Sequence, residues 1–126
     1  MSTFAWLIYF EQGPHDLNSL ATALEHYGLA VTARGPMSFI VSDGRGSVRV
    51  NYNDRDFVRD EAQEMTTRVF HRDAREIAIC GRRIELTWSA ADAPEVTNIL
   101  GFIEPEVQSL TTKCWIFDTW GRGAWL

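Results

Sequence analysis

The chain has 126 residues, of which 45% are hydrophobic and 23% charged, as is typical of one globular domain. The formal net charge is −5 at pH 7, and Lys113 is the single lysine. Because phosphate binding requires clustered lysine and arginine, this balance argues against nucleic acid as a partner. We therefore expect one domain over residues 1–126 that does not bind nucleic acid.

The first element expected is a strand over Phe4–Phe10, which is apolar throughout. A short apolar run suits a strand buried on both faces, whereas crossing a bilayer takes about 20 residues. No basic residue precedes the run and no small-residue cleavage site follows it closely. We expect a cytoplasmic protein without a signal peptide and without a membrane partner.

A helix is expected after the break at Gly13-Pro14. Asp16 is a typical N-cap residue, and apolar residues then recur at helical spacing from Leu17 to Tyr27. Gly28 follows the last of them, and glycine commonly ends a helix. The pattern predicts one helix between these start and stop signals.

Three strands of alternating polarity are expected next. Gly35-Pro36 separates the first two strands, and Asp43-Gly44-Arg45-Gly46 separates the last two. The second of these breaks has the composition of a hairpin turn, so the last two strands should pair antiparallel. The apolar residues that define the strands are Leu29, Val31 and Ala33, then Met37, Phe39 and Val41, then Val48, Val50 and Tyr52.

The segment after Asp54 predicts a helix with one apolar face and an acidic ridge. Asp54 can cap this helix, and Asp56, Asp60 and Glu64 stand four residues apart, so they should form a ridge opposite the apolar face. The ridge is either a solvated helix face, with aspartates favoured near the helix N-terminus, or a surface for a basic partner. The sequence leaves both interpretations open.

The remaining elements expected are a second hairpin, a helix and a last strand. The hairpin should join Glu76–Cys80 to Arg83–Trp88 through a glycine-arginine turn. The helix should begin at Asp92-Ala93-Pro94, and Pro105 should either kink it or begin a second short helix. Cys114–Thr119 should form the last strand.

This element order predicts an α+β fold in which a mostly antiparallel sheet packs against two or three helices. Two stretches share the order strand, helix, strand, and each ends in Gly-Arg-Gly, at residues 44–46 and 121–123. A duplication that produced two β-α-β halves would explain the likeness, and so would chance reuse of a common pattern. Both explanations stay open.

The sequence lacks the common signatures of metal sites, phosphate loops and serine hydrolases. It has no Cys-x-x-Cys pattern, no histidine at metal-ligand spacing and no Gly-x-Ser-x-Gly elbow. Cys80 and Cys114 have no adjacent histidine, and two buried free thiols are their simplest interpretation. A hairpin turn is favoured over an anion site for the Gly-Arg-Gly sequences. We expect no metal, no cofactor and no catalytic residue.

The sequence favours a protein-binding or inhibitory function for a small acidic cytoplasmic protein, and its acidic charge favours a basic partner. Bacterial immunity proteins have this compositional character, although no motif here identifies a family. Acidic and aromatic groups would provide the contact, and charge would speed association. The tryptophans near the C-terminus either pack in the core, which is favoured, or form a contact patch. The predicted partner-binding residues are Asp56, Asp60, Glu64 and Trp120.

Two alternatives remain. The first is a small enzyme or ligand-binding domain with a pocket between helix and sheet, in which Arg45, Arg122 and His71 would serve anion or proton chemistry. The sequence shows no pairing of nucleophile and base and no cofactor fingerprint, which disfavours an enzyme. The second alternative is a structural or adaptor subunit that forms homodimers or larger homo-oligomers through an exposed strand or the C-terminal tryptophans.

Overall fold

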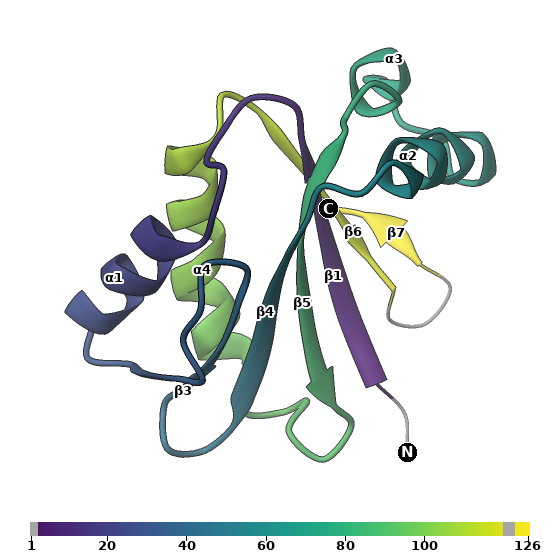
Figure 1. The fold of residues 1–126 in the computed structure, drawn as a ribbon. Coiled ribbons are helices and arrows are strands. Elements are labelled where there is room, and N and C mark those ends of the chain that lie inside the picture. Colours follow the sequence, from purple (N-terminus) through teal and green to yellow (C-terminus); the bar gives the residue numbers. More distant parts are fainter. Residues whose placement is uncertain (1–2, 120–122) are drawn as a thin grey trace.

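An antiparallel sheet of seven strands runs through the molecule, with helices on both of its faces (Figure 1). The computed structural model describes residues 3–119 and 123–126. The strands are β1 Thr3–Phe10, β2 Ala30–Thr32, β3 Ser38–Ser42, β4 Ser47–Asn53, β5 Arg82–Ser89, β6 Cys114–Asp118 and β7 Ala124–Trp125. The helices are α1 Asn18–His26, α2 Phe57–Arg68, α3 Ala74–Ile77 and α4 Thr97–Leu110.

The strand order is β2-β3-β4-β5-β1-β6-β7, and every neighbouring pair is antiparallel. Strand β1 lies inside the sheet, paired with β5 on one side and β6 on the other. Ile8 faces one layer of helices and Tyr9 the other, and both are fully buried. The continuous apolar run of this strand follows from burial on both faces. The edge strands β2 and β7 have only three and two residues, which limits pairing with another chain.

Helices α1 and α4 cover one face of the sheet along a large apolar core. Leu20 and Leu24 of α1, and Ile99 and Ile103 of α4, are at most 1% exposed. These pairs recur at spacings of four residues, so each helix presents one apolar stripe to the strands. The burial of these stripes positions both helices.

Helices α2 and α3 cover the opposite face, and Figure 1 shows them together at one end of the strands. The apolar cluster beneath them is smaller and includes Tyr9, Val58, Ala62, Ile77 and Phe117. These two helices therefore have less apolar contact with the sheet than α1 and α4 have.

The predicted α+β class is confirmed, as are the first helix and the three strands that follow it. Asp16 is not the N-cap residue itself; its Oδ1 accepts a hydrogen bond from the Asn18 amide at 3.0 Å. The duplication is not confirmed by the topology. Strands β5 and β6, joined through α4, run parallel with β1 between them, whereas β1 and β3 run antiparallel with two strands between them.

The predicted strand over Glu76–Cys80 is wrong, and so is the second hairpin. The segment forms the short helix α3 and a loop, because Ile77 and Cys80, three residues apart, are both buried while Ile79 between them is 52% exposed. Strand β5 pairs instead with β1 and β4. Helix α4 also begins later than predicted, at Thr97, and Pro105 stays inside it.

Candidate functional site

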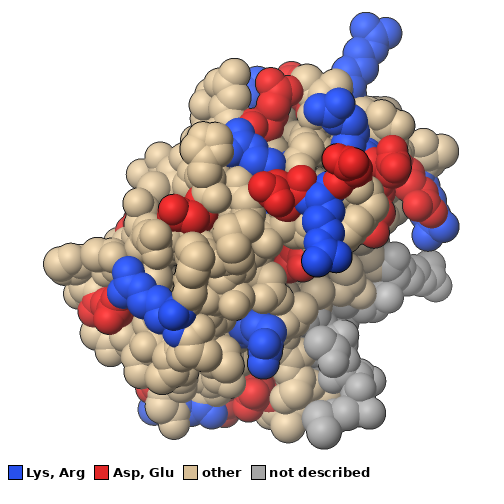
Figure 2. Space-filling view, viewed as in Figure 1, with Lys and Arg blue, Asp and Glu red and all other residues tan. Residues whose placement is uncertain are grey.

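The predicted acidic ridge begins at Asp56, which is the N-cap residue of α2 in place of the predicted Asp54, and continues on the outer face of this helix. Asp56, Asp60 and Glu64 are all exposed, and Glu64 pairs with Arg68 at 2.5 Å. Figure 2 shows several acidic side chains, with basic ones among them, gathered over this helix. The ridge therefore has the geometry that the sequence predicted, while binding by the ridge stays a prediction.

A buried guanidinium fastens α2 to the sheet beneath this ridge. Arg83 of β5 is 6% exposed and forms ion pairs with Glu61 of α2 at 2.7 Å and Glu85 of β5 at 2.6 Å. It also donates a hydrogen bond to the Tyr9 hydroxyl at 3.0 Å and lies over the Phe57 ring, 5.6 Å from its centroid. Burial alone would lower the pKa of Arg83, but its hydrogen bonds to Glu61 and Glu85 outweigh burial and raise that pKa. The guanidinium stays charged and holds α2 in place.

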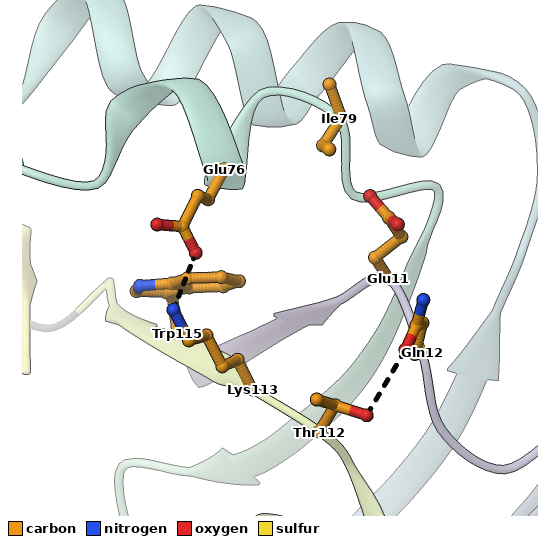
Figure 3. Close-up of a pocket in the computed structure, with 7 residues that line it drawn as sticks. All are labelled: Glu11, Gln12, Glu76, Ile79, Thr112, Lys113 and Trp115. Atoms are coloured by element: carbon orange, nitrogen blue, oxygen red, sulfur yellow. Dashed lines mark hydrogen bonds and ion pairs between the residues drawn. The ribbon is translucent and has the colours of Figure 1, made fainter.

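A hollow opens beside α3, and we call it the α3 hollow (Figure 3). It encloses about 300 Å³. Its walls come from the end of β1, from α3 and the loop after it, and from the start of β6, so three distant parts of the sequence meet there. The lining residues are Glu11, Gln12, Glu76, Ile79, Thr112, Lys113 and Trp115.

Hydrogen bonds and one ion pair fix the rim of the α3 hollow. Lys113 Nζ lies 3.0 Å from Glu76 Oε2, and both side chains are about half exposed or more. The Trp115 Nε1 group donates to Asp73 Oδ2 at 3.1 Å, which holds the indole ring in position. Figure 3 shows Trp115 and Glu76 on one side of the hollow and Ile79 and Glu11 on the other.

The α3 hollow combines negative charge with exposed apolar surface. Glu11 and Glu76 supply two carboxylates against the one cation of Lys113. Ile79 is 52% exposed and the Trp115 ring is half buried. A lysine or arginine from another protein could place its charged end near the carboxylates and its methylene stem on these apolar groups.

The two cysteines are free thiols in an environment that suppresses their reactivity. Burial raises the pKa of Cys80 from its ordinary 9.0 to about 12. Burial also raises the pKa of Cys114. Because the thiolate is the reactive form, both groups are poor nucleophiles near neutral pH. Among the described residues, no group of three or more histidine, cysteine, aspartate or glutamate side chains could hold a metal ion.

The first Gly-Arg-Gly sequence is a closed hairpin turn. Gly44 has a φ of +89°, a conformation that glycine adopts readily. Asp43 Oδ1 accepts hydrogen bonds from the backbone amides of Arg45 at 2.9 Å and Gly46 at 3.1 Å. These amides lower the pKa of Asp43. Its carboxylate already occupies the donors that an anion would need, which supports the hairpin interpretation.

The C-terminal strand returns to the sheet through Trp125. The indole Nε1 donates to the Val69 carbonyl at 3.0 Å, and the ring packs edge-on against Phe117 and His71, with centroids 5.0 and 5.8 Å away. Core packing is therefore confirmed for this tryptophan. Trp120, a predicted partner-binding residue, and Arg122, a candidate for anion or proton chemistry in the alternative enzyme or ligand-binding domain, lie outside the described residues.

No local sequence pattern indicated the α3 hollow. Glu76 and Ile79 fell in a segment predicted as a strand, and Glu11 and Trp115 are separated by more than a hundred residues. No helix in the described part of the chain is long and apolar enough to cross a membrane. The chain matches no protein-family model, no curated protein and no solved structure. Its function has to be inferred from the geometry of the described residues.

Proposed function

We propose that this chain binds a basic partner protein through the α3 hollow and the acidic ridge of α2. The observation that carries the proposal is the α3 hollow, where an exposed isoleucine and a half-buried tryptophan ring line the same depression as two carboxylates. Aromatic groups in a partly desolvated depression are typical of the residues that dominate protein interfaces. The net charge of −5 also favours a basic partner.

Exposed apolar side chains next to α3 support a protein partner. Phe70 is 85% exposed and Ile79 is 52% exposed, and they stand on either side of α3 in the chain. A single exposed apolar residue is common on protein surfaces and carries little weight. Ile79 lines the α3 hollow together with the carboxylates of Glu11 and Glu76, so a partner that covers the hollow would also bury this side chain.

The sequence of events on binding follows from the charges. The carboxylates of α2 would attract a basic surface from a distance, because long-range charge mainly speeds association. A lysine or arginine of the partner would then enter the α3 hollow and compete with Lys113 for Glu76. In the free chain, Lys113 Nζ lies 3.0 Å from Glu76 Oε2. Binding of this kind would neutralise or regulate the partner without any chemical step.

The test is affinity capture with the wild-type chain as bait, followed by calorimetric titration of the captured protein with purified variants. We expect the double variant Glu11→Lys, Glu76→Lys to weaken binding at least about tenfold, because it removes both carboxylates and adds repulsion. Glu95→Lys is the matched control: this exposed acid precedes α4, at the opposite end of the strands from α3, and should leave affinity unchanged.

Reversal of the acidic ridge tests the second part of the surface. Asp56, Asp60 and Glu64 are exposed on the face of α2 that points away from the sheet, so changing all three to lysine should leave the fold intact. We expect binding to be abolished, with circular dichroism unchanged. Equal affinity of the wild-type chain, the double variant and this triple variant would overturn the proposal.

A further inference from the structure

A second hollow lies between α4 and the sheet. Figure 1 shows that α4 covers the face opposite to α2 and α3. We call this hollow the tryptophan cleft, and it encloses about 370 Å³. Sites for small ligands in proteins begin at about 300 Å³ and are mostly apolar, with a few polar groups. The cleft has this character. The residues that line it include Trp6 of β1, Trp88 of β5, Asp118 of β6, and Leu100, Gly101 and Glu104 of α4.

The two tryptophans form an aromatic corner in the cleft. Their ring centroids are 6.4 Å apart and their planes meet at 76°. Trp88 is 4% exposed, and its Nε1 finds no hydrogen-bond acceptor among the described residues. The position of this ring is therefore set by its apolar and aromatic surface rather than by its polar group. Tryptophan is the aromatic side chain that attracts cations most strongly, and such corners suit quaternary ammonium groups.

The charges in the cleft are negative. Glu104 of α4 and Asp118 of β6 both line it, and no lysine, arginine or histidine does so among the described residues. A positively charged guest would meet the half-buried Glu104 carboxylate at the rim and tryptophan rings inside.

Gly101 is an exposed residue at the rim of the cleft. A Cβ at this position would have no described atom within 4 Å outside its own stretch of helix. Glycine is unfavourable in a helix interior compared with alanine, so its presence in the middle of α4 is not explained by helix stability. Any larger side chain here would project into space that the cleft now offers to a guest.

From these features we propose that the tryptophan cleft binds a small organic cation, namely an ammonium group carried on an apolar body. This site is separate from the protein-binding surface proposed above, since it lies on the other face of the sheet. Trp6, which is half-buried and packs against the buried Trp88, would present its ring to the ammonium group, Glu104 would neutralise its charge, and the apolar wall that includes Leu100 would contact the rest of the ligand.

The test uses benzyltrimethylammonium, titrated into the full chain and followed by two-dimensional NMR of the tryptophan indole signals. We expect the signals of Trp6 and Trp88 to shift in a saturable way, while that of Trp125 on the opposite face stays in place. Trp6→Phe and Trp88→Phe variants assign these signals. Benzyl alcohol carries a similar ring without charge, and benzenesulfonate carries one with a negative charge. Both compounds should bind at least about fivefold more weakly than benzyltrimethylammonium.

Variants then locate the binding. Gly101→Leu should fill the cleft and abolish the shifts, and a thermal melt will show whether the variant is folded. Glu104→Gln, at a half-buried surface position, should weaken cation binding about fivefold without altering the fold. Glu95→Gln lies outside the cleft and is the control expected to bind as the wild-type chain does. The proposal would be overturned if the indole signals showed no saturable shift up to about 20 mM cation, because a preformed site should bind more tightly than that. Equal binding of benzyl alcohol would also overturn it, as would unchanged cation binding by a folded Gly101→Leu variant.

Discussion

Helices α1 and α4 are held on their face of the sheet by apolar side chains, whereas α2 is held on the other face partly by a buried guanidinium. On the first face, Ile99 and Ile103 of α4 are fully buried in the large core. On the second face, Arg83 links Glu61 of α2 to Glu85 of the sheet. The apolar contact beneath α2 and α3 is small by comparison.

This difference indicates that the two faces contribute unequally to stability. Apolar burial contributes free energy in proportion to the area removed from water, whereas a buried ion pair gives little net stability but is costly to break. We therefore expect the α1 and α4 face to unfold only with the whole molecule. The α2 and α3 segment should open first, and it carries the surface proposed to bind a partner.

The largest effect is expected from truncating the α4 side of the core. Ile99→Ala should lower the free energy of unfolding by about 3–4 kcal/mol, because it removes buried methyl groups and leaves a cavity. Ile99 is fully buried in the large cluster, so relaxation around it should be limited. Urea unfolding followed by circular dichroism measures the change. A loss below about 1 kcal/mol would mean that this face is not the main source of stability.

A smaller and more local effect is expected from Arg83→Met. The substitution leaves Glu61 and Glu85 without their shared cation. It should lower the free energy of unfolding by about 2–3 kcal/mol, near the lower end for breaking a buried pair, because the Glu61 side chain is 43% exposed. Hydrogen exchange should accelerate most in α2. Adding Glu61→Gln and Glu85→Gln should restore much of the loss, since no unpaired charge then remains. Uniform acceleration in α4 as well would contradict the proposed difference between the faces.

The effect that is smallest near neutral pH comes from Cys80, under the α2 and α3 layer, because it develops only as the pH rises above about 9. Its pKa is raised by burial from 9.0 to about 12, so the folded chain keeps this proton where the unfolded chain loses it. Stability should therefore fall as pH rises above about 9 and continue falling toward 12. Cys80→Ala should show a shallower fall over the same range in denaturant titrations. An identical slope would show that Cys80 does not contribute.

Local patterns predicted much of the fold. The alternation from Leu29 to Tyr52 and the turn at Gly44 identified strands β2, β3 and β4, because neighbouring residues decide both the alternation and the turn conformation. The pattern failed over Glu76–Cys80, where apolar residues two apart suggested a strand. Burial of Ile77 and Cys80 beneath α2 made the same residues a helix and a loop.

The sequence by itself determined the α+β class, the acidic ridge of α2 and the central apolar strand, since each depends on residues close together in the chain. Only the tertiary structure decided where Arg83 finds its partners, and which residues line the α3 hollow and the tryptophan cleft. The physical reason is that strand pairing brings β1, β5 and β6 together in an order that the sequence does not follow. Side chains as distant as Trp6, Trp88 and Asp118 thereby share one cleft.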